Sequence, residues 1–196
     1  MNWKVFLQNV SKGIIEEGEL EEKFRKDTSD YLGFPGATAE EISQEEKRLG
    51  CSLPPSYKDF LRNSNGFKQL NHNVWDIHPV QKIDWLGNLD PDFVKATLKD
   101  PVRPEDEKYF VYGKEQDPVY VRHEYFQHCL ALSAWGDVAI VLLNPEVRFQ
   151  EEWEAWMYAS WIPGANRYRS FEELMIEEYQ NFWRIINHEE EDFLEL

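Results

Sequence analysis

Two groups of residues in this sequence have the types that chemistry needs. His72, Asp76 and His78 lie in one short segment, and on a β-strand these three positions point to the same face. Two imidazoles and a carboxylate on one face could hold a metal ion such as zinc. The spacing fits no established ligand motif, however, and polar residues alternating with Trp75 and Ile77 also describe an ordinary half-solvated strand. We therefore expect no metal and no cofactor, and a metal-dependent enzyme remains an alternative.

The second group is Cys129 with its neighbour His128, which could pair as nucleophile and base. Adjacent residues on a strand face opposite sides, so His128 is poorly placed to activate the thiol. Cys129 in the run Cys-Leu-Ala-Leu is more typical of a small buried apolar residue. The sequence also lacks the glycine-rich phosphate loops and the Gly-x-Ser-x-Gly motif of hydrolases. We predict no catalytic residues and a protein that is not an enzyme.

One segment combines large rings with carboxylates, which is typical of a binding surface. Tryptophan is enriched in binding hot spots, and acids around it would select a basic partner. The alternative is that the tryptophans pack in the core while the acids face water, since tryptophan is usually well buried. The residues predicted to contact a partner are Asp137, Glu151, Glu152, Trp153, Glu154 and Trp156.

Composition limits the classes of function. The 196 residues are 42% hydrophobic and 15% aromatic, which predicts a folded chain of domain size. The 21 basic and 37 acidic residues give a net charge of −16, which argues against binding to nucleic acid or to an anionic membrane surface. Residues 151–196 contain twelve acids and three arginines, so more than half of the net charge lies there. Such a field could steer a cationic partner, or simply keep the protein soluble.

The compartment is predicted from cysteines and from apolar runs. Two cysteines, Cys51 and Cys129, are too few for a disulfide scaffold and suit a reducing environment. The start of the chain lacks the pattern of a signal peptide, and no stretch approaches the ~20 apolar residues of a membrane helix. We expect a soluble, cytoplasmic protein.

The elements that must position these residues can be read from periodicity and capping signals. Thr38 and Glu41 are spaced as a capping box, as are Ser170 and Glu173. Gly13 and Gly18 are expected to interrupt the N-terminal helical pattern. Residues 151–161 fit a helix or a strand equally well. We expect helices over 3–12, 19–26, 38–50, 54–66, 90–98 and 170–186, and strands over 74–77, 109–112, 119–122, 129–134 and 138–143. Consecutive strands with short connections predict antiparallel pairing.

The segment from Pro35 to Gly66 carries a resemblance. It contains a capped helix with Glu-Glu-Ile, then Leu-Gly, Leu-Pro, Tyr, Phe-Leu and a closing Asn-Gly. In this order it resembles the opening of the SUKH superfamily, which includes fungal cell-wall-synthesis regulators and bacterial toxin-immunity proteins. The motif residues expected to form the scaffold are Ile42, Leu53, Pro54, Tyr57, Phe60, Leu61, Asn65 and Gly66.

The resemblance implies a fold and a function. The fold would be α+β, an antiparallel β-sheet with helices packed on one side and at the edges, plus an extra N-terminal helical segment. The divisions would be a helical extension over 1–30, a SUKH-like domain over 31–187 and an acidic tail over 188–196. The function would be non-catalytic protein binding, as an immunity protein that neutralises a basic toxin catalytic domain. A regulatory scaffold related to the cell-wall-synthesis regulators is the alternative.

Overall fold

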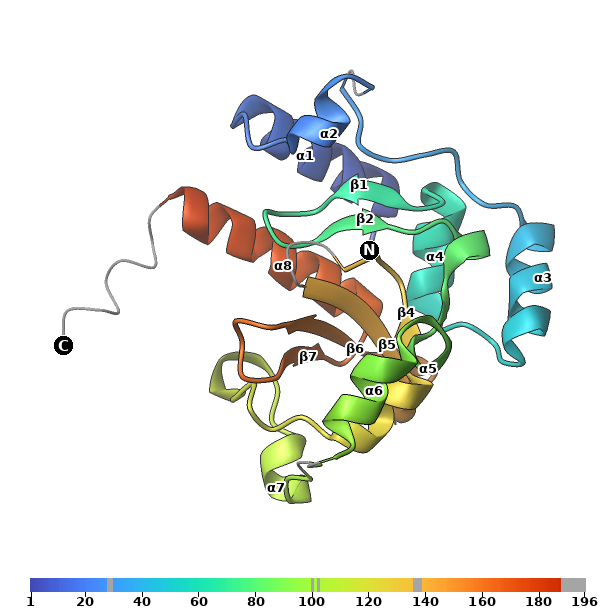
Figure 1. Cartoon of the computed structure of the whole chain (residues 1–196). Helices are drawn as coiled ribbons and strands as arrows, with labels where there is room; N and C mark the ends of the chain where they lie inside the picture. Colours follow the sequence, from blue (N-terminus) through green and yellow to red (C-terminus); the bar gives the residue numbers. More distant parts are fainter. Residues whose placement is uncertain (28–29, 100, 102, 136–138, 188–196) are drawn as a thin grey trace.

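The computed structural model describes residues 1–27, 30–99, 101, 103–135 and 139–187, and it is α+β as expected. Its main sheet has five antiparallel strands in the order β3-β4-β5-β6-β7, and a two-stranded sheet, β1-β2, lies beside it (Figure 1). The strands are β1 Phe67–Gln69, β2 Trp75–Ile77, β3 Asp84–Trp85, β4 Leu130–Ala131, β5 Ala139–Phe149, β6 Glu152–Ala159 and β7 Ala165–Tyr168.

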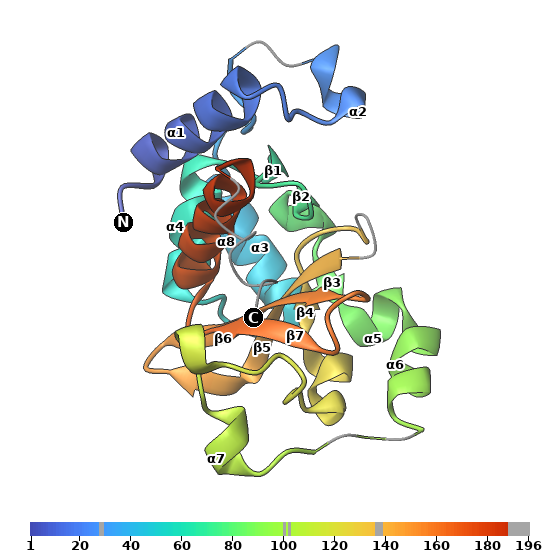
Figure 2. The same cartoon turned by 90° about the vertical axis from the view of Figure 1, so that its left-hand side faces the viewer.

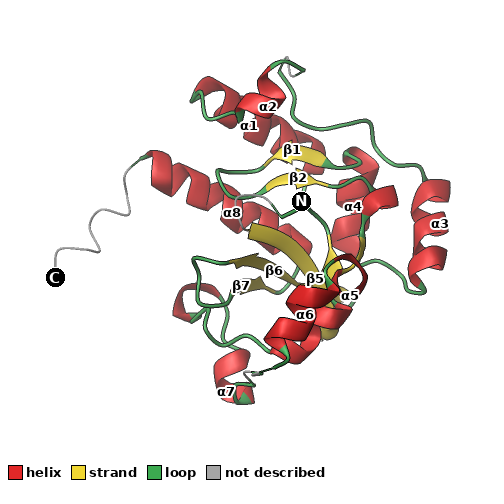
Figure 3. Cartoon of the chain, in the orientation of Figure 1, coloured by secondary structure: helices red, strands yellow, loops and turns green. Residues whose placement is uncertain are grey.

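Four longer helices lie on one side of the main sheet, and shorter helices lie on the other (Figures 2 and 3). The first set is α1 Trp3–Glu16, α3 Ala39–Leu49, α4 Pro55–Asn63 and α8 Phe171–Ile186, with α2 Glu22–Arg25 beside α1. The second set is α5 Leu86–Leu89, α6 Pro91–Thr97, α7 Asp106–Tyr109 and the 3₁₀ turns η2 Gly113–Glu115 and η3 His123–His128. A further turn, η1 Val80–Lys82, follows β2. The sheet is therefore covered on both faces, where the sequence predicted cover on one side and at the edges.

The capping signals explain where the helices begin and end. Thr38 and Glu41 form the predicted capping box, and Gly50 ends α3 in the left-handed region with φ 74°. The Ser170 hydroxyl caps α8 by accepting from the Glu173 backbone N–H. The Glu173 carboxylate accepts instead from the backbone of Arg169, one residue earlier than in a capping box.

Helix α1 continues through Gly13, so the predicted interruption is wrong. A side chain at Gly13 would lie 2.7 Å from the Tyr179 hydroxyl, so the glycine lets α8 approach α1 closely. Trp3 of α1 packs its ring against Phe60 and Phe171, at centroid distances of 5.5 and 5.8 Å. The N-terminal helix thus shares one buried core with α4 and α8. The boundary at residue 30 stays a prediction.

Residues 151–161, which fitted two patterns, form strand β6 as far as Ala159. Its partner β5 pairs with it in antiparallel register, with Leu142 opposite Trp156. Alternation along β6 places Trp153, Ala155 and Met157 on the face covered by the longer helices. Trp156 and Tyr158 lie on the opposite face, against Phe126 and its neighbours.

Two predicted strands are wrong. Tyr109 ends helix α7 and residues 110–112 follow it, while 119–122 lie in the connection between η2 and η3. Their β-prone side chains serve to cover the second face of the sheet, so tertiary packing overrides the local preference. A side-chain amide completes this cover: Gln116 donates from Nε2 to the Arg167 carbonyl at 2.7 Å and accepts from the Arg167 N–H at 2.6 Å. It therefore occupies the edge of β7 as a neighbouring strand would.

Candidate functional site

The six residues predicted to contact a partner do not form one surface. Glu151 is exposed, and Glu152 is half-buried. Trp153, Glu154 and Trp156 are 1%, 0% and 0% exposed, and the two rings lie on opposite faces of the sheet. Asp137 lies outside the described residues. Direct contact with a partner is therefore retained as a proposal for Glu151, while the three buried residues can act only through the fold.

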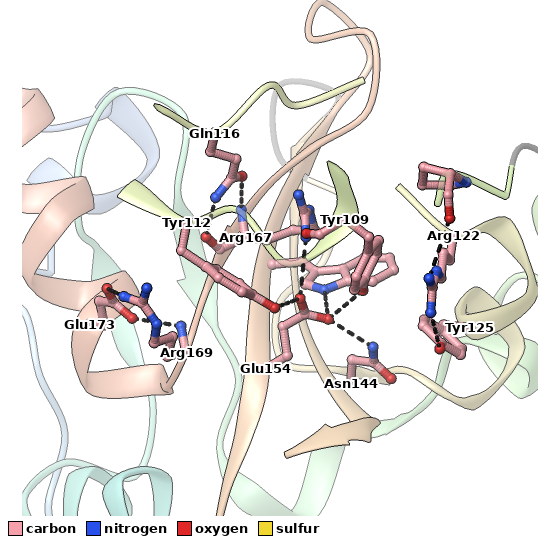
Figure 4. Close-up of polar contacts among 12 residues, drawn as sticks. Tyr109, Tyr112, Gln116, Arg122, Tyr125, Asn144, Glu154, Arg167, Arg169 and Glu173 are labelled. Carbon is pink, nitrogen blue, oxygen red and sulfur yellow. Dashed lines mark hydrogen bonds and ion pairs between the residues drawn. The ribbon is translucent and has the colours of Figure 1, made fainter. Parts of the chain in front are cut away.

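Glu154 is the centre of a buried polar network (Figure 4). The hydroxyls of Tyr109 and Tyr112 donate to its two carboxylate oxygens, each at 2.6 Å. Trp156 Nε1 and Asn144 Nδ2 donate to Oε2 at 2.8 and 2.9 Å. Four donors from β5, β6 and the α7–η2 segment thus converge on one carboxylate. A buried charge is tolerated when it is paired and hydrogen-bonded in this way.

Arg167 supplies the opposite charge. Its Nη1 lies 3.6 Å from Glu154 Oε1, and both side chains are fully buried. Nη1 also donates to the Tyr109 carbonyl, and the guanidinium stacks over the Tyr109 ring at 4.3 Å. The network therefore holds the α7–η2 segment against strands β6 and β7 of the sheet.

Burial is the main cause that raises the pKa of Tyr109 and Tyr112, and the Glu154 carboxylate raises both further. The phenols therefore remain protonated and act as hydrogen-bond donors, which is the role the carboxylate requires. Each of these contacts joins two parts of the chain, so a structural role is sufficient to explain the cluster.

Glu152 has a structural partner at the other side of the sheet. Helix α4 begins at Pro55 after Pro54, and proline offers no capping side chain. The Glu152 carboxylate takes that place, accepting from the Ser56 backbone N–H at 2.8 Å and from the Ser56 hydroxyl at 2.6 Å. A carboxylate at a helix N-terminus also interacts favourably with the helix dipole.

Replacing Glu152 with alanine is expected to lower the free energy of unfolding by about 1–2 kcal/mol, because α4 loses its cap. Glu151→Ala is the matched control, since Glu151 is exposed and forms no hydrogen bond or ion pair among the described residues. Its expected change is within about 0.5 kcal/mol. Urea unfolding of both variants measures the difference; equal effects would show that Glu152 does not cap α4.

A second buried carboxylate, Glu178, joins α8 to the loop before β2. It accepts from the Tyr168 hydroxyl at 2.5 Å and from Asn71 Nδ2 at 2.9 Å. Burial raises the pKa of Glu178, and the hydrogen bonds oppose this only in part. No cation lies within ion-pair distance of it among the described residues. Glu178 therefore differs from Glu154, which has Arg167.

The raised pKa of Glu178 predicts a pH dependence. Near pH 4.5 and above, the unfolded chain releases this proton while the folded chain retains it, so folding loses stability as pH rises through the folded pKa. Glu178→Gln removes this pH-dependent loss of stability, because the glutamine side chain does not titrate, and its amide oxygen can still accept a hydrogen bond. We expect the stability of the variant relative to the parent to increase as the pH rises above about 4.5. Thermal unfolding of both proteins across that range checks it; a difference that stays constant with pH contradicts the assignment.

The three candidate metal ligands do not share a strand face. Strand β2 spans only Trp75–Ile77, and Asp76 adopts a left-handed backbone with φ 53°, which breaks the alternation. His72 lies 2.9 Å from Glu19, and Asp76 pairs with Lys23 at 2.5 Å. Among the residues that the structure describes, no group of three or more His, Cys, Asp or Glu could hold a metal ion.

The Cys129–His128 pair is also separated. Cys129 is fully buried, and burial raises the pKa of its thiol well above the ordinary value. His128 is exposed and lies 3.1 Å from Glu146. A thiol that stays protonated in the core is a poor nucleophile.

A groove beside the start of α3 was not predicted from the sequence. It has a volume of about 590 Å³ and is lined by residues from the loop before α3, from α3 itself, from the turn after α4, and from β2 to η1: Phe34, Pro35, Gly36, Glu41, Asn65, Asp76, Ile77, His78, Pro79 and Lys82. Pro35, Gly36, Glu41 and Asn65 belong to the segment that carried the resemblance. The motif was interpreted as scaffold only, although part of it borders this groove.

Hydrogen bonds between the motif and η1 hold one wall of the groove. Asn65 Oδ1 accepts from the Val80 N–H at 2.8 Å, and Asn65 Nδ2 donates to Gln81 at 3.1 Å. Gln81 in turn donates to Glu41 Oε1 at 3.0 Å. Gly66 has φ 102°, and a side chain there would lie 2.8 Å from the Ile77 carbonyl. These contacts fix the segment from Ile77 to Lys82 against the motif.

The rest of the motif is structural. Leu53, Tyr57, Phe60, Leu61 and Ile42 are all buried in the core that includes α1 and α8. Pro54 is the N-cap position of α4. They hold α3 and α4 together and present no polar atom to solvent, although the Tyr57 hydroxyl is buried without a hydrogen-bond partner among the described residues.

These features define an α+β protein with one antiparallel main sheet, capped helices and a groove at the start of α3. The sequence model of the SMI1/KNR4 family (SUKH-1) matches residues 36–195, and the chain belongs to this family. Proteins of this family commonly bind protein partners, and membership is consistent with an immunity or a regulatory module. A search of curated proteins finds no match. Within the described residues, no helix is long and apolar enough to cross a membrane.

Proposed function

We propose that this chain is a non-catalytic immunity protein that binds the catalytic domain of a cognate bacterial toxin and neutralises it in the cytoplasm. The observation that carries the proposal is the family match over residues 36–195 in a chain with a net charge of −16. A toxin domain that acts on nucleic acid needs a basic surface, and an acidic inhibitor complements that surface.

The buried networks support a rigid binding scaffold. Glu154 with Arg167, Glu152 with Ser56 and Glu178 with Tyr168 each join elements that are distant in the sequence. A preformed surface loses less conformational freedom on binding, which favours affinity. These three carboxylates are engaged in contacts within the chain. A partner would therefore contact other acidic side chains, among them Glu151.

Neutralisation is tested by co-expression. The DNA flanking the gene is sequenced, and the C-terminal domain of any adjacent large secreted protein is produced in bacteria with and without this chain. The proposal predicts that the domain alone stops growth and that the chain restores it. Continued growth arrest in the presence of soluble, folded chain would contradict neutralisation and would favour the regulatory role.

A further inference from the structure

The groove beside α3 contains polar groups that the fold does not use. Lys82 and His78 both line it, and neither side chain has a hydrogen bond or an ion pair among the described residues. The carboxylates that line the groove are, by contrast, already engaged. Glu41 accepts from Thr38 and Gln81, and Asp76 pairs with Lys23. Lys82 and His78 therefore bring donors to the groove that the fold does not use.

Apart from Asn65 and Gly36, the remaining lining is apolar. Phe34 is 41% exposed, which is high for a ring of that size, and Pro35, Ile77 and Pro79 continue the apolar lining. A volume of about 590 Å³ lies in the range of sites that bind small molecules. Apolar walls with a few convergent donors are the usual composition of such a site.

We propose that this groove binds a carboxylate joined to an apolar group, with Lys82 and His78 holding the carboxylate and the Phe34 side of the groove covering the apolar part. Lys82 supplies the charge. Burial, and then the nearby Lys82, lower the pKa of His78, so at neutral pH its ring is uncharged and donates one N–H. A charged hydrogen bond and a neutral one are thus both available to the two oxygens of a carboxylate.

The net charge of −16 does not prevent this binding. At physiological salt the interaction between exposed charges is screened beyond about 8 Å, so the groups inside the groove dominate. This inference does not rest on the proposed toxin binding. The carboxylate could belong to a small free acid or to the C-terminus of a peptide, and the two can be separated by experiment.

The test is an NMR titration of the full chain labelled with ¹⁵N. Two acids are used, 3-phenylpropionate and acetyl-glycyl-phenylalanine, each beside its own neutral amide. We expect an acid to bind with a Kd on the order of 1–5 mM. Its shifts should centre on residues 34–36 and 76–82, and its amide should bind at least about fivefold more weakly. The acid that binds better identifies the source of the carboxylate.

Variants assign the binding to the proposed residues. Lys82→Gln is expected to weaken the binding of the acid about five- to tenfold, and His78→Gln about threefold. Lys95→Gln is the matched control, because Lys95 is an exposed lysine at a different, shallower groove. Lys82 is exposed, so its variant should fold normally, which circular dichroism confirms. Binding of the amides equal to that of the acids, shifts centred elsewhere, or no effect of Lys82→Gln would each overturn the proposal.

Discussion

Replacing Glu154 with glutamine is expected to lower the free energy of unfolding by about 3–5 kcal/mol. The carboxylate is fully buried, and it balances the fully buried charge of Arg167. Four neutral donors from Tyr109, Tyr112, Asn144 and Trp156 also point at it. A glutamine can accept on one oxygen only, and its NH₂ group would face donors. The variant therefore leaves the buried Arg167 without its counter-charge and at least one buried donor without an acceptor.

Urea unfolding at pH 7 measures this effect, and Glu178→Gln is its control. Both substitutions change one atom in a buried carboxylate, but among the described residues only Glu154 has a cation within ion-pair distance. Glu178→Gln also turns one NH₂ group toward a donor, but it leaves no buried cation without its counter-charge, so we expect a clearly smaller loss at that pH. A loss below about 1 kcal/mol for Glu154→Gln would contradict the central position of the ion pair.

The second large effect is expected from Trp156→Ala, with a loss of about 3–5 kcal/mol. The indole packs edge-on against Phe126 at 5.3 Å and donates to Glu154. Its removal leaves a cavity on the second face of the sheet and frees one acceptor of the buried network. The substitution therefore lowers the free energy of unfolding and does not remove a direct contact with a partner.

Trp161→Ala is the matched control, because Trp161 is 49% exposed at the turn after β6. Its removal should change stability by no more than about 0.5 kcal/mol. Thermal unfolding followed by circular dichroism compares the two variants. If Trp156→Ala unfolded at the same temperature as Trp161→Ala, the placement of Trp156 in the core would be wrong.

Much of the first half of the fold could be predicted from the sequence because its signals are local. The Thr38–Glu41 box, Gly50 and Pro55 each fix a helix end through contacts within a few residues. The second half depends on contacts between distant residues. Tyr109 and Tyr112 form a β-prone run, yet their hydroxyls are fixed by Glu154, more than forty residues away. No local pattern contains that information.

The same reason explains the outcome for the candidate site. Glu151, Glu152, Trp153, Glu154 and Trp156 are adjacent in sequence, but strand alternation and distant partners assign them different roles. Glu152 caps α4, Trp153 and Trp156 lie on opposite faces, and Glu154 pairs with Arg167. The groove beside α3 was missed because His78 and Lys82 approach Glu41 only after folding. The feature of the sequence that could have indicated the groove is the motif from Pro35 to Gly66, which borders it.

The proposal that this chain binds a basic toxin domain is tested by calorimetric titration of the two purified proteins. We expect a one-to-one complex whose association constant falls steeply between about 50 and 300 mM salt, because the opposite charges of the two surfaces are then screened. Absence of binding, or a complex whose affinity does not change with salt, would contradict it.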